Sequence, residues 1–291
     1  MDVKTQSLAD LLPAADAEPP ARDSIDDGGV EPAQRGWGSF VWFMVKLLLA
    51  VLAFRTLAFA PFSIPSESML PRLMNGDYLL AAKWPYGISR YSLPFDLPLP
   101  EGRLFARPPE RGDIVIFKHP IDGRDYIKRV IGLPGDSVAV FSGWAVINGG
   151  PVRSKRVPDA QIVQSPNTGC EWGGLLERLD DGRDACRYAR FRETLPDGTN
   201  YDVLDFGQTQ GDTFEPQIVP EGMIFVMGDN RDNSRDSRFP AVAGDGVGFV
   251  PQDLLVGRAS IIVWSTDGSA DWIKPWTWFS AARWDRIGDR L

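Results

Sequence analysis

Residues 113–136 read DIVIFKHPIDGRDYIKRVIGLPGD, and this stretch decides the fold class. Its two runs at 113–118 and 126–131 are rich in Val, Ile and Phe and are bounded by Gly, Pro and Asp. β-Branched and aromatic residues between turn formers are typical of short β-strands. Similar runs follow at 137–141, 145–148, 223–227 and 256–264. We therefore expect an all-β domain of mainly antiparallel sheets with tight turns.

The composition narrows the function classes. The chain has 291 residues with a net charge of −8, so it lacks the basic excess that nucleic-acid binding requires. Its single His excludes a zinc site built on several imidazoles, and a Ser-His-Asp triad would have to use His119. We expect no metal, no cofactor and no nucleic-acid partner.

The N-terminal part divides into an acidic tail and an apolar segment. Residues 1–36 hold eight acidic residues and few large apolar ones, which predicts a disordered tail. Between Phe40 and Phe62, thirteen residues are Leu, Val or Phe, and the only charges are Lys46 and Arg55. Such a helix would be roughly 34 Å long, enough to cross a hydrocarbon core. We expect one transmembrane anchor over 37–61; a buried helix of a soluble core and a cleaved signal peptide are the alternatives.

The remaining chain is expected to form a β domain from 62–149 and 220–291. Residues 150–219 are polar, contain both cysteines and show only weak strand patterning, so they are expected to form an inserted smaller subdomain. Cys170 and Cys186 could form a disulfide, with two free thiols as the alternative.

Three separated motifs contain residues suited to catalysis. The first, FSIPSESMLP at 62–71, places two serines between prolines that restrict the backbone. The second, DYIKRVIGLPGD at 125–136, contains Lys128 in a largely apolar strand, where a desolvated lysine loses its proton more readily and can act as a general base. Taken alone, they could also be a linker and an ordinary strand.

The third motif is MGDNRDNSRDSR at 227–238, whose Asp and Asn density indicates a loop held by side-chain hydrogen bonds and ion pairs. A calcium loop beginning at Asp232 is excluded. Its sixth position is Ser237 where Gly is needed, and its twelfth is Ala243 where Glu is needed.

In this order and behind an anchor, the motifs resemble those of bacterial type I signal peptidases, also called leader peptidases. The resemblance runs from roughly Ser39 to Arg286 and rests on IPSESMLPRL, RGDIVIFK, DYIKRVIGLPGD and MGDNRDNSRDSR. It implies a membrane-bound serine endopeptidase that removes signal peptides from exported preproteins after small residues. The tail would be cytoplasmic and the catalytic domain periplasmic, at the bacterial inner membrane.

The resemblance also implies individual roles. Ser68 matches the nucleophile and Lys128 the general base, a dyad that needs no His. The Ser66 hydroxyl and the Ser68 N–H would form the oxyanion hole, while Ser234 would hydrogen-bond and orient the Lys128 amine. Positions of the apolar substrate pockets are matched by Ile64, Ile116 and Ile127. Architectural roles fall to Arg129, Asp229, Arg231, Asp236 and Arg238.

Two residues depart from the family pattern. Glu67 stands where a small residue is expected, and Arg72 stands where Thr or a similar residue is usual. A carboxylate pointing inward could raise the pKa of Lys128. We expect Glu67 to point outward.

Two other functions would be compatible with parts of this sequence. A self-cleaving Ser-Lys repressor would lack the anchor and carry a basic DNA-binding module. An anchored periplasmic binding or assembly factor would lack Ser68 or Lys128, and both are present. The C-terminal Trp276, Trp278 and Trp284, with Trp272, are expected either to rest on the bilayer or to cap the β core.

Overall fold

A computed structural model describes residues 36–87, 89, 91, 102–271 and 273–291. The chain divides into two compact units, residues 1–46 and residues 47–291. The expected disordered tail over 1–36 lies, except for Gly36, outside the described residues.

One long helix, α1, spans Trp37–Leu57. Its side chains from Trp37 to Val51 are exposed, and most of them are apolar. No helix in the described part of the chain meets the combined length and apolarity required for crossing a membrane. The expected anchor over 37–61 is helical only to Leu57, because the chain enters a β-strand at Phe59.

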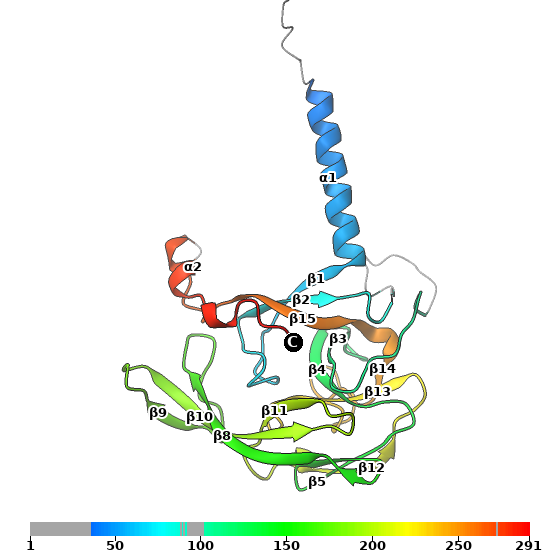
Figure 1. Cartoon of the computed structure of the whole chain (residues 1–291), viewed down its shortest axis with the longest axis vertical. Coiled ribbons are helices and arrows are strands. Elements are labelled where there is room, and N and C mark those ends of the chain that lie inside the picture. Colours follow the sequence, from blue (N-terminus) through cyan, green and yellow to red (C-terminus); the bar gives the residue numbers. More distant parts are fainter. Residues whose placement is uncertain (1–35, 88, 90, 92–101, 272) are drawn as a thin grey trace, which may run out of the picture. The chain divides into compact units, whose positions relative to one another are not determined.

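The main sheet of residues 47–291 has seven strands in the order β1-β2-β15-β3-β4-β13-β14 (Figure 1). Neighbouring strands in it are antiparallel. The strands are β1 Phe59–Ser63, β2 Asp77–Ala82, β3 Ile114–Lys118, β4 Asp125–Gly132, β13 Met223–Met227, β14 Val250–Pro251 and β15 Leu255–Ser265. The stretch at 113–136 thus forms the β3–β4 hairpin in the middle of this sheet, where Val115 faces Lys128.

Two four-stranded antiparallel sheets accompany it. One has the order β12-β5-β6-β7, and in the other β10 pairs with β8, β9 and β11. Their strands are β5 Ser137–Phe141, β6 Trp144–Ile147, β7 Gly150–Pro151, β8 Arg153–Val163, β9 Leu175–Arg178, β10 Asp184–Thr194, β11 Asn200–Leu204 and β12 Thr213–Ile218. The antiparallel β architecture expected from the sequence is therefore confirmed.

The expected insertion at 150–219 is more regular than its sequence pattern predicts. It contains β8 and β10, each 11 residues long and paired along most of their length (Figure 1). Charged side chains occupy many exposed positions of both strands, so the apolar alternation that marks a strand is absent. Only residues 153–204 form a sheet of their own, because β12 pairs with β5 instead.

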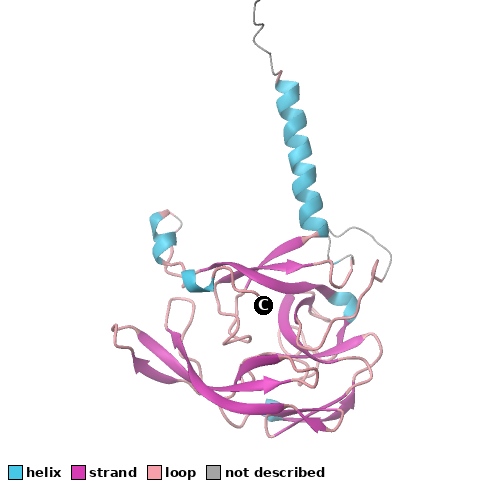
Figure 2. Ribbon diagram, in the orientation of Figure 1, coloured by secondary structure: helices cyan, strands magenta, loops and turns pink. Residues whose placement is uncertain are grey.

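The inserted sheet shares a core with the rest of the β domain. Leu195, Tyr201 and Val203 pack in one buried cluster with residues such as Val138 and Phe225. Helical elements are short apart from α1 (Figure 2). They are η3 Gln210–Asp212, η4 Gln252–Leu254, α2 Trp276–Ser280 and η5 Trp284–Arg286.

Candidate active site

The first serine motif forms the turn that follows β1. Met69, Leu70 and Leu73 are at most 1% exposed and anchor this turn in the core. Backbone bonds from Leu70 N to Glu67 O (3.1 Å) and from Leu73 N to Met69 O (2.9 Å) hold its shape. Apolar anchors on the C-terminal side of Ser68 therefore fix the position of the serine.

Ser68 and Lys128 meet although 60 residues separate them in sequence. Lys128 Nζ donates a hydrogen bond to Ser68 Oγ at 2.7 Å. The two side chains come from different elements, the turn after β1 and the inner strand β4 of the main sheet. Long-range strand pairing is thus what forms the dyad.

Burial changes the acidity of this lysine. Lys128 is 4% exposed, and the desolvation of its ammonium form lowers its pKa to about 8, although the charges of Asp236 and Asp229 oppose the shift. A lower pKa increases the fraction of neutral amine near neutral pH. The buried amine is therefore suited to accept the proton of Ser68.

The other two serines lie close to the dyad. Ser66 is exposed, and its Oγ lies 3.5 Å from Ser68 Oγ. Ser234 is buried, but its hydroxyl makes no hydrogen bond to Lys128 in this structure. A Cβ on Gly228 would lie 2.3 Å from Ser234 Oγ and 2.5 Å from the Ser68 carbonyl oxygen, so Gly228 allows these two groups to pack against the same loop.

Three buried ion pairs support the third motif. Arg129 binds both carboxylate oxygens of Asp229, Arg238 binds Asp236, and Arg231 binds Glu193 at 2.7 Å. Asn230 adds backbone contacts, with its N–H donating to Ser68 O (3.1 Å) and its Nδ2 to Glu67 O (3.2 Å). This loop therefore positions the serine turn directly.

Sequence reasoning identified neither Glu193 nor Asn230 as a positioning residue. Glu193 lies in β10 of the inserted sheet, among exposed charged residues, and no motif distinguishes it. Asn230 lies inside the third motif, but its contacts depend on how the loop approaches Ser68. Of these two residues, only Asn230 belongs to a motif that the sequence reveals.

The three isoleucines expected to line substrate pockets lie together. Ile64, Ile116 and Ile127 belong to one buried cluster and are 3%, 2% and 8% exposed. Their participation in substrate recognition stays a prediction.

The expectation that Glu67 points outward is wrong. Its side chain is 9% exposed and lies beside Gly169, whose backbone N–H bonds to the carboxylate. Burial and the charge of Glu171 raise the pKa of Glu67 to about 7. The pKa of Lys128 is nevertheless lowered rather than raised. Arg72, the other departure, bonds to the Arg290 carbonyl and pairs with Asp289.

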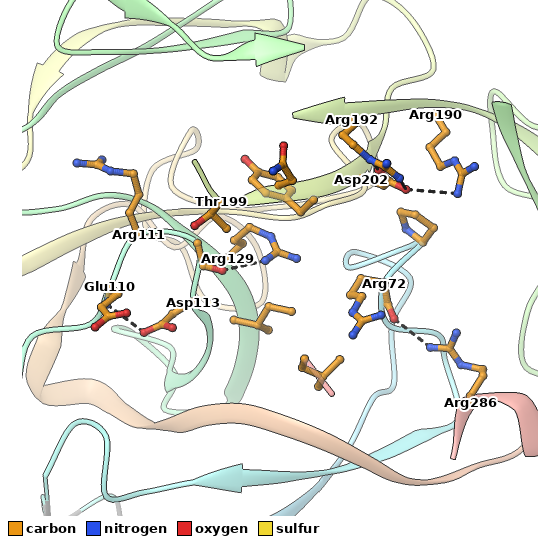
Figure 3. Close-up of a pocket in the computed structure, with 16 residues that line it drawn as sticks. Arg72, Glu110, Arg111, Asp113, Arg129, Arg190, Arg192, Thr199, Asp202 and Arg286 are labelled. Atoms are coloured by element: carbon orange, nitrogen blue, oxygen red, sulfur yellow. Dashed lines mark hydrogen bonds and ion pairs between the residues drawn. The ribbon is translucent and has the colours of Figure 1, made fainter. Parts of the chain in front are cut away.

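Figure 3 shows the residues that line a cavity, which has a volume of about 890 Å³. Arg129 and Tyr201 are among its lining residues, but Ser68 and Lys128 are not. The arginines that line it are each paired with a carboxylate: Arg72, Arg111, Arg129, Arg190, Arg192 and Arg286. Because every one of these arginines already has an acidic partner, with Arg190 and Arg192 sharing Asp202, we assign the cavity no part in the chemistry.

The single histidine, His119, contacts groups other than Ser68 and Lys128. His119 is 1% exposed and its ring contacts Gly246 O (3.1 Å) and the Asp122 carboxylate (3.4 Å). Within the described residues, no group of three or more His, Cys, Asp or Glu side chains could hold a metal ion. The Cys170–Cys186 disulfide is confirmed, with a Cα–Cα distance of 5.2 Å.

Comparisons with known proteins identify the family of this chain. The sequence model of the family described as "Signal peptidase, peptidase S26" matches residues 37–264. A signal peptidase I of Rickettsia massiliae is 35% identical over 254 residues, covering 84% of each chain. One of Rickettsia typhi is 38% identical over 237 residues, covering 78% of this chain and 80% of that protein.

Among solved structures, a signal peptidase I from Enterococcus faecalis is 26% identical. It covers 53% of this chain and 98% of its own, with a TM-score of 0.29. The family match and the Rickettsia relatives each span most of the chain, and the matched residues 37–264 include the serine turn, β4 and the third motif. The chain therefore belongs to the signal peptidase I family, peptidase family S26.

Proposed function

We propose that this protein is a membrane-bound serine endopeptidase that cleaves signal peptides from exported preproteins after small residues, with Ser68 as nucleophile and Lys128 as general base. The observation that carries the proposal is the 2.7 Å contact between Ser68 Oγ and a buried Lys128 Nζ. Family membership supports the substrate class.

The reaction follows the usual two-step acyl transfer. Neutral Lys128 accepts the Ser68 hydroxyl proton while Oγ attacks the scissile carbonyl, and the resulting ammonium donates that proton to the leaving amine. A water molecule then attacks the ester carbonyl while Lys128 accepts one of its protons, the acyl–Oγ bond breaks, and the ammonium returns that proton to Ser68 Oγ. The Ser66 hydroxyl and the Ser68 N–H donate to the oxyanion, with Ser66 Oγ already near the nucleophile.

Cleavage of a preprotein tests the proposal directly. The full chain, purified in detergent, should produce one new N-terminus directly after a small residue, as mapped by mass spectrometry. A folded protein that binds the preprotein and leaves it intact would favour the alternative, an anchored periplasmic binding or assembly factor without catalysis.

Membrane attachment belongs to the same proposal. The apolar segment 37–61 would be a single anchor, with the tail over 1–36 in the cytoplasm and the β domain in the periplasm. The Cys170–Cys186 disulfide supports a location of the β domain in an oxidising compartment. Preproteins and the lipid bilayer would then be the partners of this protein.

The lowered pKa of Lys128 predicts a pH dependence. Because the base must be neutral, kcat/KM should rise with pH up to about 8, the pKa of Lys128, and then level off. At pH 6, two units below that pKa, it should be about 100-fold below the plateau. Initial rates on a short peptide between pH 5.5 and 9.5 measure the profile. Lys128→Arg should be inactive throughout, because a guanidinium keeps its proton; a flat profile for the wild type would contradict the assignment.

Exposed aromatic side chains gather near the C-terminus. Trp276, Phe279 and Trp284 are 68%, 65% and 56% exposed, and Phe279 stacks on Trp284 at 6.2 Å between ring centroids. Trp284 also packs edge-on against Trp264 of β15, with 5.8 Å between ring centroids, whereas Trp276 and Trp278, the latter 39% exposed, leave much of their surface uncovered. Trp rings prefer the headgroup level of bilayers. We therefore infer that this surface contacts lipid.

Replacing Trp276 and Trp278 by Ser should weaken the binding of residues 58–291 to phospholipid vesicles at least severalfold and change the melting temperature little. The reason is that the rings lose contact with lipid but bury little area within the protein. Vesicle co-sedimentation and thermal denaturation measure the two effects. Trp144→Ser, at another site that is 46% exposed, is the matched control. A large drop in melting temperature would refute the lipid contact.

A further inference from the structure

Next to the nucleophile lies a buried carboxylate that the proposed mechanism does not use. Glu67 Oε2 has no hydrogen-bond partner among the described residues, while the carboxylate receives one backbone N–H bond from Gly169. A buried carboxylate oxygen without a partner costs free energy, so such atoms usually face a ligand or a functional group. Glu67 therefore requires an explanation beyond packing.

Glu67 lines a cavity of about 520 Å³ that also reaches Ser66. A second carboxylate, Glu171, lines the same cavity. Amides and hydroxyls form much of the remaining wall: Ser66, Asn75, Ser165, Asn167, Thr168 and Asn233. None of the described residues that line it is Lys, Arg or His. The cavity thus holds two acidic groups without a cation facing them.

A disulfide and hydrogen bonds from residues that do not line this cavity hold its walls in place. The Cys170–Cys186 disulfide and a bond from Glu171 N to Tyr188 Oη (2.7 Å) fix the segment that carries Glu171. Arg283, which does not line the cavity, bonds to Ser165 and Asn167 at 3.2 Å. The buried Glu67 carboxylate and the backbone that carries Glu171 are therefore in place before any ligand arrives, which lowers the entropic cost of binding, while the exposed Glu171 side chain can adjust to the ligand.

A cationic group is the ligand that best fits these charges. The charge of Glu171 contributes to the raised pKa of Glu67, and a positive group between the two would relieve that repulsion. Ca²⁺ is a weaker fit, because its affinity depends on the number of charged ligands and no group of three or more His, Cys, Asp or Glu side chains that could hold a metal ion is found within the described residues. The polypeptide substrate, by contrast, must reach Ser68, whose neighbour Ser66 lines the cavity.

We propose that the cavity lined by Glu67 and Glu171 binds a lysine or arginine side chain of the preprotein on the mature side of the scissile bond. The mature side is favoured because Ile64, Ile116 and Ile127, the expected pockets for the signal-peptide side, do not line this cavity. The inference rests on the proposed function and adds a specificity pocket to it.

Paired peptide substrates test this pocket with the full-length protein in detergent. Each pair differs only in carrying Lys or Met at one of the first three positions after the cleavage site. At one of these positions, the wild type should show a kcat/KM for the Lys peptide about tenfold above that for the Met peptide, about 1.4 kcal/mol. The Met residue matches Lys in length without its charge.

Variants identify the groups responsible. Glu67→Gln and Glu171→Gln should each reduce the Lys-to-Met ratio severalfold, and the double variant should bring it close to one. Because Glu67 adjoins Ser68, Glu171→Gln keeps the test valid if the first variant folds poorly. Glu177 lies in β9 and does not line the cavity. The control variant Glu177→Gln should therefore keep the wild-type ratio.

The outcomes separate this inference from the function on which it rests. Cleavage of the Met peptide without a Lys preference at any of the three positions overturns the specificity pocket alone. A preference that survives in the double variant, or that appears only with added Ca²⁺, overturns it as well. If neither peptide is cleaved by the wild type, both the pocket and the proposed peptidase activity fail.

Discussion

Ser68→Ala and Lys128→Ala are each expected to lower kcat/KM by about three to six orders of magnitude. The first change removes the attacking oxygen, and the second removes the amine that lies 2.7 Å from it and takes its proton. Since the two residues act as one unit, the double variant should be little worse than either single variant. Cleavage of a preprotein or short peptide, followed with enough enzyme to detect slow turnover, measures all three.

His119→Ala is the control for this prediction. His119 is the only residue in the chain that could serve a His-dependent triad, and its ring contacts Asp122 and Gly246 rather than Ser68. Because the ring is buried, the change should lower stability, so activity must be compared per folded molecule. A folded His119→Ala protein without activity would contradict the Ser-Lys dyad.

Glu193→Ala is expected to lower the free energy of unfolding by about 3–5 kcal/mol, because it leaves a buried guanidinium without its carboxylate. Burial alone would lower the pKa of Arg231, but the negative charge of Glu193 holds this pKa above its ordinary value. The Tyr201 hydroxyl also donates to Glu193 at 2.7 Å and would lose its acceptor. Thermal and urea denaturation of purified protein measure the loss.

The same change should reduce activity even below the melting temperature. Arg231 follows Asn230, whose N–H and Nδ2 hold the carbonyls of Ser68 and Glu67, so a loosened Arg231 should displace the serine turn. Glu177→Ala is the matched control, because its pair with Arg187 (3.3 Å) is partly exposed and worth about 1 kcal/mol or less. Equal losses in the two variants would refute the structural importance of the Glu193–Arg231 pair.

The sequence alone was sufficient to predict the fold class and to propose the two dyad residues. Short apolar runs between turn formers report strands locally, which is why the β3–β4 hairpin at 113–136 could be predicted from one stretch. The dyad residues were identified by the family resemblance of their motifs, and the contact between Ser68 and Lys128 agrees with it. For the two cysteines, the sequence left a disulfide and two free thiols as alternatives, and the structure contains the disulfide.

Only the tertiary structure decided which charges meet. The inserted sheet was not predicted because most exposed positions of β8 and β10 carry charged side chains and the buried positions between them do not alternate regularly. Glu67 was expected in solvent, but the segment around Gly169, about a hundred residues later, covers it. Glu193 likewise pairs with Arg231 across 38 residues. A sequence pattern reports the face on which a side chain lies, whereas burial and pairing depend on which distant segment packs against that face.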